Sequence, residues 1–220
     1  MALYEVWSRL TEEFSQVSTH FQGFVSARSS ISSAADFVLK DECTLEGLLS
    51  RTWQAWCGFC RSCVVESCMG TTNGQGALVS QHMNALSEGH VSGAAIRAKA
   101  TPTPPTWGRT NLILKNEPTW GDVDVLNLII PRLGSANRAQ LLAAFSSASD
   151  SAKALQTIRN ASAHYNLQTM ANIQGMRSQF ISFPITHPIQ ALYWVNPISS
   201  DFLIQHALDE LLEVGLAAIS

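Results

Sequence analysis

The segment from residue 159 to residue 166 combines side chains that could act together on a phosphate. Arg159 carries a permanent positive charge, and five residues later His164 carries an imidazole that titrates near neutral pH. On an ideal helix Asn160 and His164 share a face, whereas Arg159 lies about 140° round the axis from His164. The two groups therefore reach one phosphate only if the arginine side chain extends round the helix or the helix ends near His164.

The same segment also has a purely structural interpretation. His164 and Asn166 would cap the last carbonyl groups of a helix, and Arg159 would pair with an acidic side chain. The spacing alone leaves this alternative open.

A cluster of cysteines is the second feature with chemical potential. The chain has five, namely Cys43, Cys57, Cys60, Cys63 and Cys68. The spacings at 57–60 and 60–63 are found in redox and zinc motifs, but a second ligand pair downstream and a βαβ context are both missing from the sequence. The surrounding apolar pattern is helical, so we interpret these cysteines as small, reduced, apolar residues of a helix.

Other common catalytic signatures are absent from the sequence. The histidines at 82, 90, 187 and 206 do not show the spacing that metal sites on helices use, and the acidic residues after His206 are typical of a solvated helix face. There is no P-loop, glycine-rich dinucleotide turn or serine-nucleophile elbow. We therefore expect neither a metal nor a cofactor.

The elements that must position these residues are helices. Apolar residues recur mainly at spacings of three and four, which predicts an all-α fold, and the length of the chain favours a single domain over residues 1–220. The family resemblance described below implies that these helices form an antiparallel helical bundle. The first predicted helix covers residues 3–25 and continues into the thirties, and the second covers 44–69, with Thr44 as the N-cap and Gly70 as the stop. Further helices are predicted at 122–133, 136–145, 149–166 and 199–218, and short helical material at 76–86. Proline-rich residues 98–120 predict an inserted loop or small hairpin.

Charge and hydropathy narrow the setting of the protein. The net charge is −3, yet residues 1–96 contain 5 basic and 9 acidic side chains, residues 97–177 contain 9 and 4, and residues 178–220 contain none and 4. The basic middle segment could attract phosphate, and the charged fraction of 14% is low enough to favour an oligomer. No apolar run matches a membrane span or a signal peptide, so we expect no membrane association and a cytoplasmic location.

The order Arg159-Asn160, a short spacer and Ala163-His164 near the end of a late helix resembles the signature of the HEPN family (higher eukaryotes and prokaryotes nucleotide-binding domain). In that signature an arginine, followed directly by a polar residue such as asparagine, precedes a histidine by a few positions. The resemblance is strongest over residues 125–170 and is architectural elsewhere, since HEPN domains are bundles with long antiparallel helices. Tyr165 stands where many members carry a glycine.

The resemblance implies a metal-independent endoribonuclease without a cofactor. It gives His164 the role of general acid or base, Arg159 that of holding the phosphate, and Asn160 that of orienting either; Ser162, Tyr165 and Asn166 are further candidates for substrate contacts. Members of the family pair two copies of the motif across a homodimer. One imidazole then accepts the proton of the RNA 2′-hydroxyl while its twin protonates the leaving 5′-oxygen.

The resemblance also implies a biological role and leaves one alternative. The expected role is the toxin or effector of a prokaryotic toxin–antitoxin or antiphage defence system, which a partner protein keeps silent. The alternative is a non-catalytic HEPN helical dimer that binds a protein or a nucleotide, with Trp107 and Trp120 of the loop as anchors.

Overall fold

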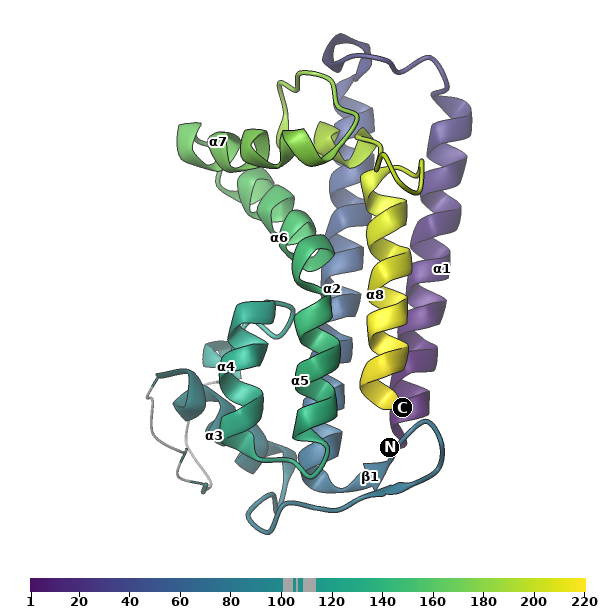
Figure 1. The fold of residues 1–220 in the computed structure, drawn as a ribbon. Coiled ribbons are helices and arrows are strands. Elements are labelled where there is room, and N and C mark those ends of the chain that lie inside the picture. Colours follow the sequence, from purple (N-terminus) through teal and green to yellow (C-terminus); the bar gives the residue numbers. More distant parts are fainter. Residues whose placement is uncertain (101–104, 106, 109–113) are drawn as a thin grey trace. The chain divides into compact units, whose positions relative to one another are not determined.

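The computed structural model describes residues 1–100, 105, 107, 108 and 114–220, and it confirms the predicted all-α fold (Figure 1). The α-helices are α1 (Leu3–Ala27), α2 (Leu39–Met69), α3 (Glu88–Ala100), α4 (Val123–Leu133), α5 (Arg138–Ser147), α6 (Ser149–Ala163), α7 (Leu167–Met176) and α8 (Leu203–Ile219). The short 3-10 helices are η1 (Ala34–Asp36), η2 (Leu114–Asn116), η3 (Arg177–Gln179) and η4 (Pro188–Tyr193). Strands β1 (Thr71–Thr72) and β2 (Leu78–Val79) form a small antiparallel hairpin.

The contacts within the chain divide it into two compact units. The first unit consists of Met1–Thr11, Trp56–Ser149 and Leu212–Ser220, and the second consists of Glu12–Ala55 and Asp150–Leu211. Helices α1, α2 and α8 contribute residues to both units. Every site residue predicted above belongs to the second unit.

In the first unit, α4 packs against α3 on one side and α5 on the other. Helix α4 has the boundaries that its sequence predicts, because Asp122 accepts hydrogen bonds from the backbone N–H groups of Asp124 and Val125, and Gly134 ends the helix with a φ of 69°. The apolar side chains of α4, among them Ile129 and Ile130, are buried in the core of this unit.

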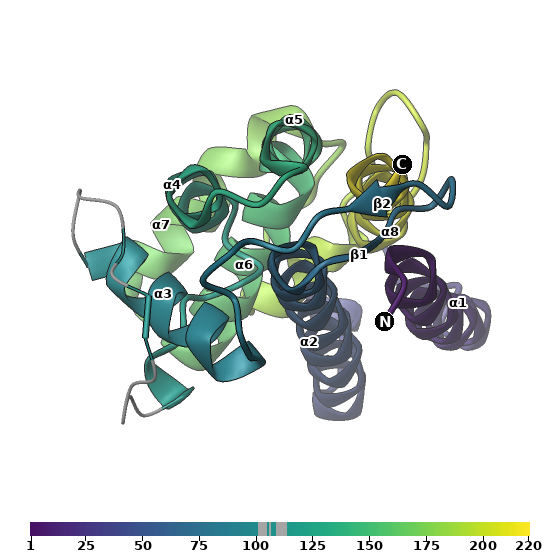
Figure 2. The same ribbon diagram turned by 90° about the horizontal axis from the view of Figure 1, so that it is seen from below.

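The hairpin holds both chain ends in the first unit, as Figure 2 shows. The Thr71 hydroxyl donates to the carbonyl of Met1 at 2.6 Å, and the backbone N–H of Gly74 donates to the carbonyl of Ile219 at 2.5 Å. The two strands pair Thr71 with Val79. Gly70, with a φ of 87°, ends α2 as predicted and starts this turn.

In the second unit, the later half of α1 and the first half of α2 are joined by residues 28–38 and run antiparallel. Buried side chains from all parts of this unit make one core: Phe14, Val17, Phe21, Leu45, Leu49, Leu155, Ile158, Ile189, Leu192, Trp194, Leu203, Ile204 and Leu208. This core fixes the face that α2 and α6 each turn to solvent.

Helix α2 begins earlier than its sequence predicts. The carboxylate of Asp41 accepts a hydrogen bond from the backbone N–H of Val38 at 3.0 Å and pairs with Arg28 at 2.7 Å, so the helix starts at Leu39. Thr44, the predicted N-cap, lies inside the helix, where its hydroxyl donates to the carbonyl of Lys40. The true N-terminal signal is an acid with a partner distant in sequence, which local reading does not reveal.

Other boundaries also differ from the prediction. Helix α1 ends at Ala27 and does not continue into the thirties, and residues 76–86 contain β2 in place of helical material. Helices α3 and α7 lie where no helix was predicted, and α8 starts at Leu203 rather than at residue 199 or 200. In α3 a run of small residues packs against α4, so tertiary burial stabilises a helix with little amphipathic pattern of its own.

The predicted inserted segment is described only in part. Helix α3 continues to Ala100, and η2 occupies Leu114–Asn116. Residues 101–104, 106 and 109–113, where most of the predicted hairpin falls, lie outside the described residues.

None of the helices in the described part of the chain combines the length and the apolar character needed to cross a bilayer.

Candidate active site

Helix α6 positions Arg159 and His164 at its C-terminal end. Leu155 and Ile158 are buried, which turns Arg159 outward to solvent. The helix ends at Ala163, so His164 follows directly after the last turn and is exposed. The helix therefore ends near His164, which is one of the two conditions under which the arginine and the histidine can reach one phosphate.

Arg159 contacts its neighbour Asn160 and leaves its remaining donors to solvent. Its Nη1 donates to Oδ1 of Asn160 at 3.3 Å. Among the described residues no carboxylate forms an ion pair with Arg159. The structural alternative required such a pair. The guanidinium instead keeps donors free for an anion such as a phosphate.

The backbone around His164 is held by several hydrogen bonds. Its N–H donates to the carbonyl of Asn160 at 2.9 Å, and its own carbonyl accepts from Nδ2 of Asn166 at 3.0 Å and from the hydroxyl of Thr169 at 2.9 Å. The capping half of the structural alternative is thus present, but it is Asn166 and not the imidazole that supplies the cap. The His164 ring remains exposed on a fixed backbone.

Two further predicted residues, Asn166 and Ser162, are less available to a ligand than Arg159 and His164. Oδ1 of Asn166 accepts from the backbone N–H groups of Gln168 and Thr169, both at 3.0 Å, so this side chain is the N-cap of α7. The Ser162 hydroxyl is buried and has no hydrogen-bond partner among the described residues. The Asn166 side chain is therefore already engaged, whereas Ser162 lines the depression between α2 and α6 although its hydroxyl is buried.

Tyr165 joins the end of α6 to the segment before η4. The ring of Tyr165 is 62% exposed, and its hydroxyl donates to the carbonyl of Thr186 at 3.3 Å. It lies almost parallel to the imidazole of His187, with an interplanar angle of 11° and 6.4 Å between the ring centroids. Two nearly parallel aromatic rings therefore lie together just after the end of α6.

A shallow depression of about 270 Å³ lies between α2 and α6 inside the second unit. It is lined by Glu46, Leu49 and Ser50 from α2 and by Arg159, Ser162 and Ala163 from α6. The α2 residues share one face at helical spacing. Sequence reasoning missed them because nothing local indicates that α2 lies opposite α6.

His187 is the other residue near the site that the sequence did not single out. Its Nδ1 accepts from the backbone N–H of Ile189 at 3.4 Å, and its Nε2 lies 3.8 Å from Oε1 of Glu46. Its own N–H donates to the side chain of Gln190, which is 1% exposed and in turn donates to Glu42 at 3.0 Å. The buried glutamine therefore locks this segment against α2.

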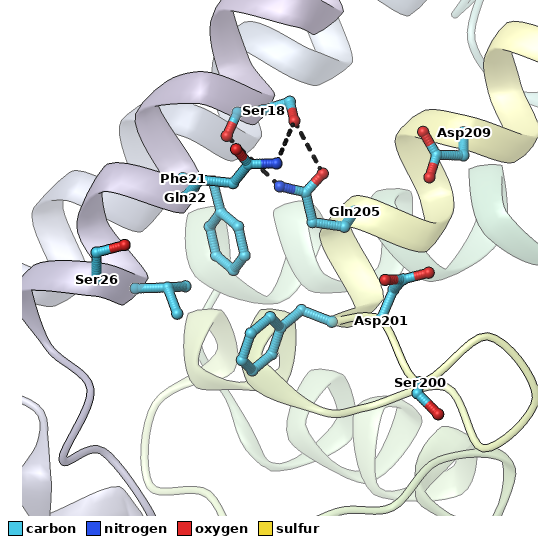
Figure 3. Close-up of a pocket in the computed structure, with 10 residues that line it drawn as sticks. Ser18, Phe21, Gln22, Ser26, Ser200, Asp201, Gln205 and Asp209 are labelled. Atoms are coloured by element: carbon cyan, nitrogen blue, oxygen red, sulfur yellow. Dashed lines mark hydrogen bonds between the residues drawn. The ribbon is translucent and has the colours of Figure 1, made fainter.

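Another hollow in the second unit is a different site (Figure 3). It has a volume of about 550 Å³, and the hydroxyl of Ser18 donates there to Gln205 at 3.1 Å. Asp201 and Asp209 lie on its α8 side, and none of the described residues that line it is basic. Its negative character disfavours a phosphate-containing ligand.

A third hollow contains His206, which forms an ion-pair geometry with Glu210 at 3.3 Å. The same carboxylate accepts a hydrogen bond from the hydroxyl of Ser151. The Glu210 side chain is 44% exposed, which agrees with the solvated face that the sequence predicts, and His206 also lines a hollow of about 430 Å³. Both groups bind Glu210, so they are not arranged as a serine nucleophile with a histidine base.

The cysteine cluster is structural, as predicted. Cys60, Cys63 and Cys68 are buried in α2, and none of the five cysteines in the described chain forms a disulfide. Burial raises the pKa of the Cys68 thiol to about 12 and also raises the pKa of Cys63. Among the described residues there is no group of three or more side chains suited to a metal ion.

The two tryptophans of the alternative hypothesis differ in their surroundings. Trp120 is 5% exposed, and its indole N–H donates to Glu117 at 2.9 Å, so it belongs to the core and is not an exposed anchor. Trp107 stacks on His82 with 4.5 Å between the ring centroids. Both residues belong to the first unit.

Compared with known proteins, the chain matches no family model, no curated protein and no solved structure.

Proposed function

We propose that the protein is a metal-independent endoribonuclease whose catalytic groups are Arg159 and His164. Two exposed groups at the end of α6 carry the proposal. Arg159 has no acidic partner among the described residues, and five residues later His164 is exposed on a backbone held by hydrogen bonds. The likeness of Arg159-Asn160 and Ala163-His164 to the HEPN signature supports the same assignment. Cleavage of a phosphodiester requires a cation for the phosphoryl oxygens and a group that transfers protons, and these are the two roles that the guanidinium and the imidazole can fill.

The proposed reaction uses the nucleophile that RNA itself supplies. An imidazole removes the proton of the 2′-hydroxyl, and the oxygen attacks the adjacent phosphorus. Arg159 stabilises the charge on the phosphoryl oxygens, and a second imidazole gives a proton to the 5′-oxygen as its bond to phosphorus breaks. The products are a 2′,3′-cyclic phosphate and a 5′-hydroxyl end, so protons and electrons balance without an added reagent.

The proposal includes a homodimer, because the acid and the base are two copies of His164. Apolar residues next to His164 support an interface here. Tyr165 is 62% exposed and Leu167 is 92% exposed, one on each side of the Asn166 cap. Large apolar side chains exposed in this way are typical of surfaces that a partner covers. The defence role and a silencing protein partner belong to the proposal on the HEPN resemblance alone.

The experiment that tests the proposal is cleavage of a labelled single-stranded RNA and of a tRNA pool in EDTA. We expect cyclic phosphate ends with the wild type and loss of cleavage in both His164→Ala and Arg159→Ala. The matched controls are His20→Ala and Arg9→Ala. They remove an exposed imidazole and an exposed guanidinium from α1, away from the candidate site. Equal helicity of all variants by circular dichroism would exclude unfolding as the cause.

The outcomes are distinct. Cleavage that His164→Ala leaves unchanged would contradict the assignment of the site. Failure of the wild type both to cleave and to bind RNA would contradict the function itself.

A further inference from the structure

The depression between α2 and α6 places a negative group beside the proposed phosphate-binding group. Glu46 and Arg159 both line it, and the Glu46 side chain is 41% exposed. No ion pair joins these two residues in the described part of the chain. Each therefore keeps hydrogen-bonding capacity for a ligand, the one as an acceptor and the other as a donor.

A carboxylate restricts which part of an RNA strand can enter the depression. Glu46 repels phosphate, so its ligand must present N–H or O–H donors. The volume of about 270 Å³ falls just below the roughly 300 Å³ at which pockets for whole small molecules begin. It suits a single base better than a complete nucleotide. Ala163, which is exposed, supplies apolar surface for the face of a base.

The aromatic residues next to the depression favour a base as well. Tyr165 and His187 present nearly parallel rings, and Nε2 of His187 lies 3.8 Å from Glu46. Protein recognition of single-stranded RNA relies on such rings, and each stacked base contributes about 1–3 kcal/mol. The buried Gln190 accepts a hydrogen bond from the His187 backbone N–H at 3.2 Å, which helps to position His187.

Among the RNA bases, guanine fits a carboxylate best. Its N1–H and N2–H₂ are adjacent donors on one edge and match the two oxygens of a carboxylate, whereas the other bases place an acceptor next to any donor on that edge. We infer that the protein binds a guanine of single-stranded RNA in this depression, with Glu46 as the residue that determines base specificity. This inference rests on the proposed ribonuclease function.

The test measures binding without cleavage. Fluorescein-labelled uridine heptamers of 2′-fluoro RNA, which lack the nucleophilic hydroxyl, carry one central guanosine, inosine or adenosine, and fluorescence anisotropy gives the Kd of each. We expect the guanosine strand to bind about tenfold or more tighter than the adenosine strand, with inosine between them because it lacks the N2 amine. Glu46→Gln should remove the preference, and Glu12→Gln, the same charge change on α1, should keep it.

Each outcome decides between the two proposals. If all strands bind equally and Arg159→Ala abolishes their binding, the guanine inference is overturned and the ribonuclease proposal stands. The inference is also overturned if Glu46→Gln, with unchanged circular dichroism, keeps the preference. If no strand binds, the guanine inference is overturned, and the cleavage assay described above decides the ribonuclease proposal separately.

Discussion

At the scale of single residues, the candidate site depends on what α6 leaves without a partner. Among the described residues, the contact that holds the Arg159 side chain is the long hydrogen bond to the Asn160 amide, while the acid in the same depression, Glu46, faces His187. The three residues therefore offer a cation, an anion and an imidazole within one small region. Their types could be read from the sequence, but their proximity could not.

The first prediction concerns the geometry of the guanidinium. Arg159→Lys keeps the positive charge but loses the planar pair of donors that fits a phosphate, so we expect kcat/KM on single-stranded RNA to fall about tenfold. Arg159→Ala should lose about 10²–10³-fold, as expected for a group that stabilises transition-state charge. Steady-state kinetics with a labelled RNA measures both. Equal activity of the lysine variant and the wild type would show that charge alone suffices.

At the scale of elements, the boundaries of a helix can be predicted when they are set by residues next to the helix ends. They cannot be predicted when they are set by contacts with residues outside the local pattern. Helix α4 has its N-cap at Asp122 and its stop at Gly134, and both are local signals that agree with the predicted range of 122–133. Helix α2 starts at Leu39 because Asp41 is held by Arg28, and such a pairing leaves no local pattern. The missed helices α3 and α7 are short and weakly amphipathic.

An ion-pair network gives the second prediction, because it ties the segment before α4 to α2 and α3. Glu117 accepts hydrogen bonds from Arg61 at 2.8 and 2.9 Å and from Trp120 at 2.9 Å, and Arg61 also pairs with Glu88. Burial opposes the charged carboxylate, but the hydrogen bonds from Arg61, Ser92 and Trp120 outweigh it and lower the pKa of Glu117 to about 2.

A lowered carboxyl pKa stabilises the folded protein above the unfolded pKa, and this stabilisation is lost as the pH falls through the folded pKa. The contribution of Glu117 is therefore complete above its usual pKa of 4.5 and disappears towards pH 2. Glu117→Gln should lower the free energy of unfolding by about 2 kcal/mol at pH 7 and by much less at pH 3. Urea denaturation at both pH values checks this, and an equal loss at both would contradict it.

The third prediction uses a close approach between helices of the first unit. A Cβ atom at Gly215 of α8 would lie 3.1 Å from Trp7, 3.2 Å from Phe59 and 3.3 Å from Leu10. Alanine is favoured over glycine in a helix by about 1 kcal/mol, but overpacking costs about 1–3 kcal/mol. We expect Gly215→Ala to destabilise the protein by about 1 kcal/mol in thermal denaturation. Gly23→Ala, which meets nothing within 4 Å on α1, is the control and should stabilise it.

At the scale of the whole molecule, the proposed reaction needs two copies of the chain. Each protomer supplies one His164, so a dimer with one mutated copy lacks either the acid or the base. This requirement can be measured without a structure of the dimer.

The fourth prediction is that the His164→Ala chain lowers RNA cleavage in mixtures with the wild type by more than simple dilution, because mixed dimers are inactive. If only dimers with two intact copies cleave RNA, an equal mixture with exchanged subunits retains about one quarter of the activity of pure wild type at the same total protein concentration. If each protomer works alone, about one half remains. The two chains are refolded together at several mixing ratios, and activity is plotted against the fraction of wild-type chain. A shared site gives a curve that follows the square of this fraction, whereas a straight line would contradict the shared site.

The sequence alone determined the fold class, because helical periodicity is a local property of side chains that recurs over many turns. It also indicated Arg159, Asn160 and His164 as candidates, because a guanidinium, an amide and an imidazole have the same chemical properties whatever fold contains them. Only the tertiary structure decided that α6 ends at Ala163, that Asn166 is engaged as a cap and that the Ser162 hydroxyl is buried. It also decided that Glu46 lines the same depression as Arg159 and lies close to His187. These relations join segments far apart in the chain, and packing, which no local pattern encodes, sets them.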